Sequence, residues 1–442
     1  MDTIVAPATP WGRGAIALLR VSGPGALSLC QSLCPGGPPW RPRRASVRRA
    51  VADGRPIDEL LVVWMPGPNS FTGEDVVELS GHGNPVVVEA LLGALVSLGA
   101  RPARPGEFTR RALENERISL LGAEALRGLI EATSPAGVAL ARAGMDGASD
   151  QFAGELREIL LDLGAEIEAR LDHPGDDLGY EDDQRVIAQL EDVATRAAAA
   201  AETWRAGRVR LHGATVALVG PVNAGKSSLF NHLVGQQRAL VSPQPGTTRD
   251  VVERSVLIDG LEVRFLDTAG ERQAPAGSVE AEGIALGRRL TEAADLLLVV
   301  VPLHAPRSDA VRALLARTAD RRRLVVGTHL DRSPSLPVTS FDAAISNQSG
   351  EGVAALRQQI RAAVDGDVGG GRLVVLSQRQ HDLFRAIGTH SRMAADALAG
   401  MLGPAVAAEE VTCALERLAE LSGEDVREAV LDRMFSRFCV GK

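Results

Sequence analysis

Residues 214–235 read ATVALVGPVNAGKSSLFNHLVG, and this stretch decides the fold of its region. Within it, residues 220–227 fit G-x-x-x-x-G-K-[ST], between an apolar run that predicts a strand and a segment that predicts a helix. Glycines let the backbone fold around phosphate oxygens. Backbone N–H groups, the amino end of the helix and the ammonium of Lys226 then bind the negative charge of these oxygens. We expect the hydroxyl of Ser227 to coordinate Mg²⁺. The stretch therefore predicts a nucleoside triphosphate site, with the nucleotide held by Asn223, Ala224, Gly225, Lys226, Ser227 and Ser228.

Lysine is almost absent from the rest of the chain. Only two of the 442 residues are lysine, Lys226 and Lys442, and all other cations among the 48 Lys and Arg residues are arginine. An ammonium is a compact point charge and a guanidinium is a planar fork, so the two are not interchangeable. The sequence thus keeps lysine in the phosphate loop and at the carboxyl end.

Two further motifs follow the loop in the order typical of GTPases. Residues 245–250 (PGTTRD) form a polar loop whose hydroxyls, Thr247 and Thr248 among them, are expected to close over magnesium. Residues 267–270 (DTAG) follow an apolar run, so that Asp267 is expected to hold Mg²⁺ through water and the Gly270 N–H to meet the γ phosphate. With Thr268 and Ala269 completing this second motif, the three segments together predict a nucleoside triphosphatase of the GTPase class.

The base-reading segment departs from the usual Asn-Lys-x-Asp. After the apolar run RRRLVVG the chain has Thr328, His329, Leu330 and Asp331. The carboxylate that accepts two hydrogen bonds from guanine is kept, but its neighbours differ, at a cost on the order of 1 to 3 kcal/mol. We expect guanine preference with reduced affinity, and a last base-side loop from Ser346 and Asn347.

The water-orienting residue is not in the Ras-like position. Glu271, and not Gln, follows residues 267–270. Glu280 and Glu282 are other candidates further along, and from position alone each is more often a solvated charge.

Composition and periodicity predict a multidomain protein of α/β and α classes. A net charge of -8, 45% hydrophobic and 24% charged residues are ordinary for a soluble globular chain and argue against a generally polycationic nucleic-acid binder. We expect an α+β domain at 1–117, a discontinuous helical domain at 118–208 and 372–442, and an inserted G domain with a mainly parallel sheet at 209–371. The run RVRLHGATVALVG is expected to be a strand of that sheet.

Signals of other chemistry are weak. Cys30 and Cys34 have helical spacing but no second Cys/His pair nearby, and Cys413 and Cys439 are too distant for a disulfide framework, so that reduced cytoplasmic thiols are expected. The amino terminus lacks a secretory pattern and no run approaches the ~18 apolar residues of a membrane span. We therefore expect a cytoplasmic protein with no membrane partner.

Taken together, several segments closely resemble the MnmE (TrmE) family of tRNA-modification GTPases over essentially the whole chain. They are GPVNAGKSS, PGTTRD, DTAG, the amino-terminal DTIVAPATPWGRGAIALLRVSG, FTGEDVVELSGHGNP, PGEFTRRALENERISLLGAEAL and the terminal FSRFCVGK. The resemblance implies a Ras-like G domain and an amino-terminal domain similar to folate-binding one-carbon enzymes. That domain is implied to mediate homodimerisation.

What the family does is likewise implied by the resemblance. With an FAD-binding flavoprotein, MnmG, such proteins install a carboxymethylaminomethyl or aminomethyl group on carbon 5 of the wobble uridine of certain tRNAs, as a heterotetramer. A tetrahydrofolate derivative, 5-formyl- or methylene-tetrahydrofolate, is implied between Arg20, Glu78 and Arg117, with Lys442 at the end of the tail. The family often has Lys where Arg117 stands, so the geometry of that contact is expected to differ.

The family's GTP hydrolysis is potassium-dependent and needs two G domains to meet. By motif match, Asn223 coordinates K⁺, with Ser242, Gln244 and Thr247 supplying the rest of that loop. A cation there takes the role of an arginine finger. Glu280 matches the water-activating glutamate, with Glu282 as second candidate. Cys439 matches a cysteine needed for modification, as nucleophile or as a small residue packed in the tail.

Two other readings of the sequence stay open at this point. One is a regulatory GTPase for ribosome or RNA assembly, without covalent chemistry. The other is a diverged, weakly hydrolysing nucleotide binder, motivated by Thr328 and His329.

Overall fold

The structure is a computed structural model of the 442-residue chain. It describes residues 2–172, 183–235, 251–268, 292–306, 308–332, 341–365, 375–400, 402–424 and 426–441. Two compact units are formed, one from Met1–Arg127, Ala153–Ala165 and Ala408–Lys442, the other from Gly128–Phe152 and Glu166–Ala407.

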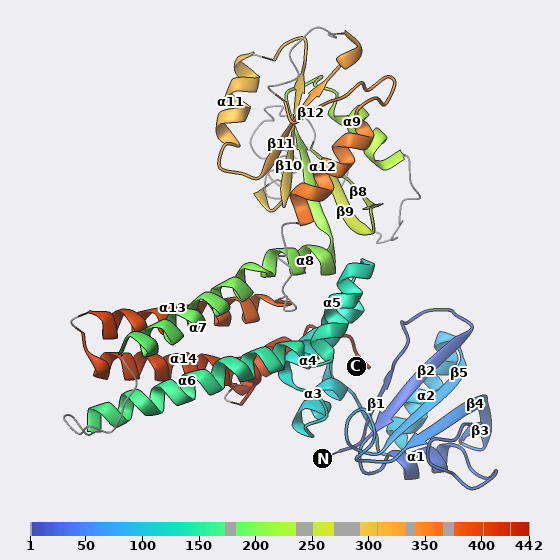
Figure 1. The fold of residues 1–442 in the computed structure, drawn as a ribbon. Coiled ribbons are helices and arrows are strands. Elements are labelled where there is room, and N and C mark those ends of the chain that lie inside the picture. The colour runs from blue at the N-terminus through green and yellow to red at the C-terminus, as the bar shows by residue number, and fades with distance from the viewer. Residues whose placement is uncertain are drawn as a thin grey trace, which may run out of the picture. The chain divides into compact units, whose positions relative to one another are not determined.

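The first unit is built on a six-stranded sheet with the order β3-β4-β5-β2-β1-β6 (Figure 1). Neighbouring strands are antiparallel, except that β1 and β6 are parallel. The strands are β1 (Ile4–Pro7), β2 (Ile16–Ser22), β3 (Ser46–Ala52), β4 (Arg55–Met65), β5 (Val76–His82) and β6 (Arg101–Pro102). Residues 1–117 thus contain the sheet that an α+β domain requires.

Two helices pack on one face of this sheet. They are α1 (Ala26–Leu33) and α2 (Pro85–Ser97), and they share a buried core with Leu19 and Leu79 of the strands. Helix α2 begins where the Asn84 side chain accepts from the Val86 N–H, with Pro85 in the first turn. Sequence periodicity did not predict α1, which is only eight residues long.

The other face of the sheet carries α3 (Glu107–Glu114), whose Phe108 packs on Ile4 and Ala6 of β1. Side chains alternate along a strand, so Arg20 of β2 lies on the face opposite to its buried neighbour Leu19. The remaining helices of this part of the chain are α4 (Leu120–Glu131), α6 (Ala148–Asp172), α14 (Pro404–Ser422) and α15 (Glu428–Phe435), of which α4, α6 and α14 extend into the second unit.

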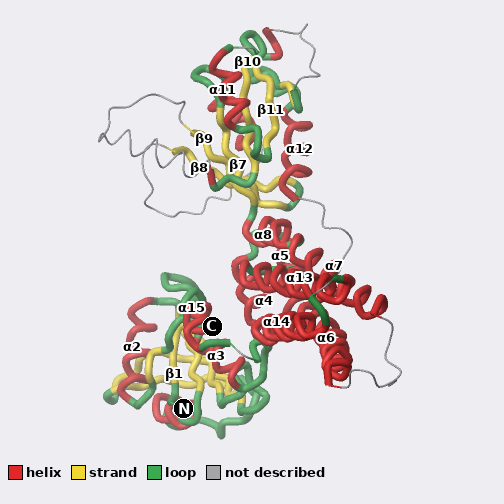
Figure 2. The backbone as a smooth tube through the Cα atoms, turned by 90° about the vertical axis from the view of Figure 1, so that its left-hand side faces the viewer, coloured by secondary structure: helices red, strands yellow, loops and turns green. Residues whose placement is uncertain are grey.

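The second unit contains the predicted parallel sheet, in the order β12-β11-β10-β7-β9-β8 (Figure 2, strands in yellow). All neighbours are parallel except β8 and β9, which form an antiparallel hairpin at the edge. The strands are β7 (Ala214–Val219), β8 (Val251–Ile258), β9 (Leu261–Thr268), β10 (Leu296–Pro302), β11 (Arg323–Thr328) and β12 (Ala343–Ala344).

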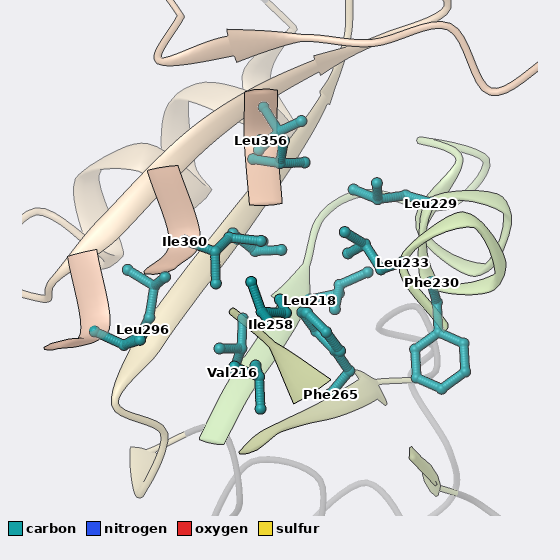
Figure 3. Close-up of a cluster of buried hydrophobic side chains, with 14 of the residues drawn as sticks. Val216, Leu218, Leu229, Phe230, Leu233, Ile258, Phe265, Leu296, Leu356 and Ile360 are labelled. Atoms are coloured by element: carbon teal, nitrogen blue, oxygen red, sulfur yellow. The ribbon is translucent and has the colours of Figure 1, made fainter. Parts of the chain in front are cut away.

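Helices cover both faces of this sheet. On one face, α9 (Lys226–Gly235) and α12 (Val353–Asp365) bury side chains against β7, β9 and β10 (Figure 3). On the other face, α11 (Asp309–Arg317) packs on a second core that contains Ala217 and Val299. Strands buried on both faces explain why β10 reads LLLVVVP without alternation.

The same unit contains the helices α5 (Pro135–Met145), α7 (Asp183–Glu202), α8 (Trp204–His212) and α13 (Gln378–Ala399), and the 3-10 turn η1 (Leu330–Arg332). Helices α7 and α13 lie side by side (Figures 1 and 2). In the described parts of the chain, none of the helices is both long and apolar enough to cross a membrane.

One predicted strand is wrong in its first half. Residues 208–212 (RVRLH) belong to α8, and only the second half of RVRLHGATVALVG is strand β7. Alternating Val209 and Leu211 suit a strand, but Ala206 and Val209 are also spaced for a helix, and all three are buried. Gly213, with φ of 77°, then ends the helix in a conformation that suits glycine.

Candidate functional site

The phosphate loop lies between β7 and α9, as the sequence predicts. Asn223 and Gly225 have φ of 62° and 84°. Lys226 is only 7% exposed, and its Nζ donates to the carbonyl oxygens of Gly220 and Pro221, at 2.9 Å each. The ammonium therefore lies inside the turn, where positive charge and backbone N–H groups favour an anion.

The start of α9 and the end of β9 supply oxygen groups beside this loop. Ser227 and Ser228 are exposed in the first turn of α9. Asp267 of β9 lies opposite Leu218 of β7 in this parallel pair. Leu218 comes two residues before Gly220, where the loop begins, and Thr268 ends β9. Hydroxyl and carboxylate oxygens are the ligands that Mg²⁺ prefers.

Two base-side segments are hydrogen-bonded to consecutive carbonyls of the phosphate loop. The fully buried Thr328 donates from Oγ1 to the carbonyl oxygen of Ala224 at 2.7 Å. Asn347 donates from Nδ2 to the carbonyl oxygen of Gly225 at 3.2 Å. His232 of α9 contacts the carbonyl oxygen of Asn347 at 2.6 Å through Nε2, which must carry the proton because a carbonyl only accepts.

Asp331 lines a cavity of about 540 Å³ together with Leu330, Ser346, Gln348, Ser349 and Glu351. The Ser346 hydroxyl donates to Asp331 Oδ1 at 3.0 Å and orients the carboxylate. His329, with φ of 62°, lies against His304 with ring centroids 5.4 Å apart. Among the described residues, the buried Nε2 of His329 has no hydrogen-bond partner.

Several predicted site residues lie outside the described residues. They are Ser242, Gln244, Thr247, Thr248, Ala269, Gly270, Glu280, Glu282 and Lys442. Asn223, the first predicted K⁺ ligand, is described and exposed.

A second site is built on the sheet of the first unit. Arg20 and Glu78 are direct partners across β2 and β5, and Arg20 donates from Nε and Nη2 to the same Glu78 oxygen, Oε1, at 3.0 and 2.8 Å. The guanidinium also lies near the rings of Phe71 and Phe108, at 5.6 and 5.9 Å from their centroids. Neither aromatic residue was among the predicted site residues.

The carboxyl-terminal tail reaches this same site. The carbonyl oxygen of Gly441 lies 3.5 Å from Arg20 Nη1, and the Gly106 N–H donates to the carbonyl oxygen of Cys439 at 3.4 Å. Gly441 has φ of 97°, and a Cβ there would lie 2.1 Å from the carbonyl oxygen of Pro7. The glycine of the FCVGK ending is therefore required by backbone conformation and by close approach. The Cys439 side chain is exposed and is not packed in the tail.

Arg117 lies beside the same segment of the sheet domain but has no described contact with Arg20 or Glu78. Its Nε is 3.3 Å from the carbonyl oxygen of Ser70, the residue before Phe71. The structure thus brings Arg20, Glu78 and the tail together, and it places Arg117 against Ser70, the chain neighbour of Phe71.

An ion-pair network around Arg101 and Arg111 lies in the same unit as this site, and sequence periodicity did not predict it. Arg101 bonds both Asp2 and Glu107, and the nearly buried Arg111 bonds Asp2 and Glu74. Hydrogen bonds from Arg101 hold the pKa of Asp2 well below its ordinary value. Burial acts to raise the pKa of Glu107, but Arg101 and the Arg104 N–H outweigh it and lower that pKa.

Cys30 and Cys34 are buried thiols of α1 and its end, and burial raises the pKa of Cys34 to about 11. No group of three or more His, Cys, Asp or Glu in the described residues is arranged to hold a metal ion.

Comparison with known proteins covers the whole chain. Residues 3–117 match a family model described as the GTP-binding protein TrmE N-terminus, and residues 120–439 match one described as the MnmE helical domain. The chain is similar to the tRNA modification GTPase MnmE of Methylobacterium sp., with 42% identity over 451 residues and 100% of both chains covered. It is also 42% identical over 445 residues to the protein of that name from Myxococcus xanthus, covering 100% of this chain and 99% of the relative.

Some of the solved structures that match cover only part of the chain. The G domain of the T. maritima FeoB iron transporter covers 34% of this chain and 98% of that domain, at 24% identity and a TM-score of 0.28. A TM-score this low supports no structural argument.

Proposed function

We propose, from the premise that the chain belongs to the MnmE (TrmE) family of tRNA modification GTPases, that its two sites serve one GTP-driven modification of tRNA. The chain is a GTPase acting in tRNA modification. Its product is proposed to be a carboxymethylaminomethyl or aminomethyl group on carbon 5 of the wobble uridine, installed with an FAD-binding MnmG-type flavoprotein. The observation that carries this proposal is the presence in one chain of a phosphate loop and of an Arg20–Glu78 site closed by the tail.

At the nucleotide site, each described residue has a role that its position supports. Lys226 holds the phosphates, because its ammonium is fixed inside the loop. Ser227 and Asp267 fit a magnesium ion by their oxygen ligands and their place beside the loop. Asp331, oriented by Ser346, accepts the hydrogen bonds of guanine in its cavity. A magnesium ion, when bound, would neutralise charge on the phosphates.

Potassium is proposed as the activating cation, held by Asn223 with Ser242, Gln244 and Thr247 when two G domains meet. The exposed position of Asn223 in the loop suits a ligand that another protomer covers. Glu280, or Glu282 in its place, orients the attacking water. Equal rates of GTP hydrolysis in sodium and in potassium would exclude this assignment.

The Arg20–Glu78 site is proposed to bind a tetrahydrofolate derivative, either 5-formyl or methylene. Glu78 uses Oε1 for Arg20, and Oε2 has no described partner, so it can accept from the N–H groups of a pterin. Phe71 supplies an aromatic wall beside the ion pair, and Arg117 and Lys442 supply charge for the folate carboxylates. A bound folate would supply a one-carbon unit, which Cys439 is exposed to meet.

The domain scheme follows the family. Residues 1–117 are proposed to form the folate-binding and homodimerisation domain, 118–208 and 372–442 the helical domain, and 209–371 the G domain. Two such chains and the flavoprotein are proposed to form a cytoplasmic heterotetramer that acts on tRNA.

The test is the nucleoside content of tRNA from cells that lack this chain. We expect the wobble uridine of these cells to be unmodified. The wild-type chain should restore the modification, and the Lys226→Met variant should not. Normal nucleosides in the deletion strain would exclude the biological assignment even if the purified chain hydrolyses GTP. Folate binding is tested separately by titration of the full chain with 5-formyltetrahydrofolate, with Glu78→Gln as the variant that loses it.

A further inference from the structure

The base-reading side of the nucleotide site lacks the asparagine usual at position 328, and two other side chains contact the phosphate loop there. Thr328 bonds the carbonyl oxygen of Ala224, and Asn347 bonds that of the next residue, Gly225. Both bonds join a base-side segment to the loop that surrounds the phosphates. A threonine has one hydroxyl proton to donate, so it cannot make the two donor contacts available to an amide.

Asn347 is held at both its side chain and its main chain. Its Nδ2 reaches Gly225, and its own carbonyl accepts from His232, which lies on the helix directly after the phosphate loop. The orientation of the amide is fixed by chemistry, because Oδ1 facing the Gly225 carbonyl would place two acceptors together. A Cβ on Gly225 would lie 2.3 Å from Asn347 Nδ2, so the close contact also depends on that glycine.

The next link leads to the base. Ser346, adjacent to Asn347, donates from Oγ to Asp331, the carboxylate that lines the cavity. The Ser346 hydroxyl also lies 3.3 and 3.2 Å from the N–H groups of Gln348 and Ser349, which close the loop. A chain of contacts thus runs from Gly225 through Asn347 and Ser346 to Asp331.

We infer that Asn347 is a positioning residue for guanine recognition, which together with Thr328 replaces the single asparagine missing from position 328. The inference rests on the proposed role of Asp331 in reading the base. Asn347 holds the loop that orients the Asp331 carboxylate, and it fixes that loop to the same turn that holds the phosphates. Phosphate binding and base recognition are thereby coupled through one amide.

The experiment uses the full-length chain and titrations with fluorescently labelled GDP, followed by competition with unlabelled GDP, IDP and ADP. Asn347→Ala is expected to raise the Kd for GDP about tenfold, the effect of losing a buried hydrogen bond and its alignment. The preference for GDP over IDP, which lacks the 2-amino group, is expected to fall as well. Asn231→Ala removes the same side chain from an exposed position on α9 and is expected to change neither quantity.

The decisive variant combines Asn347→Ala with Thr328→Asn, so that the asparagine moves from position 347 to position 328. In the Asn347→Ala background, Thr328→Asn is expected to restore most of the lost affinity and discrimination, and Thr328→Asn alone supplies the fourth corner of the cycle. A double-mutant cycle measures this non-additivity. A merely structural role for Asn347 predicts no rescue, and additive effects of the two changes would overturn the inference.

A further variant separates this inference from the base site itself. Asp331→Asn is expected to shift preference from guanine toward xanthine nucleotides, because the amide donates where the carboxylate accepted. If it does so while Asn347→Ala binds GDP normally, the base site stands and the inference on Asn347 is wrong. If Asp331→Asn keeps full guanine preference, the base is read elsewhere and both assignments are wrong.

Discussion

The two sites of this protein are held together by different kinds of contact. In the first unit, Arg20, Glu78 and the Arg101–Arg111 network are held by ion pairs, several of which join distant parts of the chain. In the second unit, the base-side segments are held by neutral donors, Thr328 and Asn347, on main-chain carbonyls. Charged contacts depend on pH and salt, whereas neutral buried contacts depend mainly on geometry. The two sites should therefore respond to different perturbations, and each response can be measured separately.

The largest effect is expected from Lys226→Met, which removes the ammonium inside the phosphate loop. GTP hydrolysis should fall about 10²- to 10³-fold, because a preorganised charge on the transferring phosphoryl group is lost. Binding of 5-formyltetrahydrofolate should be unchanged, since the Lys226 ammonium donates to Gly220 and Pro221 of the phosphate loop and is not part of the Arg20–Glu78 pair. Hydrolysis assays and folate titrations on the same sample measure the GTPase rate and the folate affinity. A matching loss of folate affinity would show that the two sites are not independent.

The next effect is expected from Gly441→Ala, which adds a Cβ 2.1 Å from the carbonyl oxygen of Pro7. The tail should leave its site, so that hydrogen exchange in residues 435–441 becomes at least about tenfold faster. Modification of tRNA should be lost while GTP hydrolysis is kept.

Gly54→Ala is the matched control for this change. Gly54 has φ of 73°, but a Cβ there meets nothing within 4 Å, so that it tests backbone strain without the clash. If both variants behave alike, close approach at Gly441 does not hold the tail.

A smaller effect is expected from Glu107→Gln, which breaks the pair with Arg101. The pKa of Glu107 is lowered in the folded chain, so its stabilisation is present above the unfolded value of about 4.3 and is lost as pH falls through the folded pKa. Near pH 7 the variant should lower the opening free energy of β1 by about 2 kcal/mol.

Native-state hydrogen exchange of β1 measures this difference, which should shrink as the pH falls below about 4. Glu114→Gln on the same helix is the control, because its pair with Arg110 is exposed and is worth about 0 to 1 kcal/mol. A Glu107→Gln penalty that stays constant with pH would show that the network is not electrostatic.

The smallest effect is expected from Thr328→Val, which keeps the shape of the side chain and removes its hydroxyl. The Kd for GDP should rise about fivefold, the value of one net hydrogen bond of about 1 kcal/mol. At fixed potassium, the ratio of variant to wild-type Kd should be the same in low and high sodium chloride, since no charge is removed. A ratio that falls with salt would contradict the neutral character of this site.

The sequence predicted those parts of the fold that local pattern determines. The strand and helix around residues 220–227 were correct because glycine, lysine and apolar periodicity all lie within one short stretch. Residues 208–212 were misassigned because five residues fit both periods, and the structure continues the helix from Trp204. The sequence could not predict α1, since eight residues carry too little periodicity.

Site residues were predicted where a motif contains them, and missed where distant segments meet. Arg20 and Glu78 were expected in one site from resemblance, and the sheet register places them opposite each other. Phe71 and Phe108 join them only through folding, and no local pattern marks either residue. The bond from Asn347 to Gly225 spans 122 residues of sequence, and only the assembled sheet brings the two together.

The join at Gly213 has a consequence for how the gene can change. Gly213 ends α8, and β7 begins at the next residue. The six residues of β7 end directly before the phosphate loop, so no extra loop residues separate these elements. Val216 and Leu218 face one core and Ala217 the other, so inserting a single codon here would exchange large and small side chains between the two cores. We expect insertions and deletions to be purged from this join, and length variation among relatives to accumulate elsewhere in the chain.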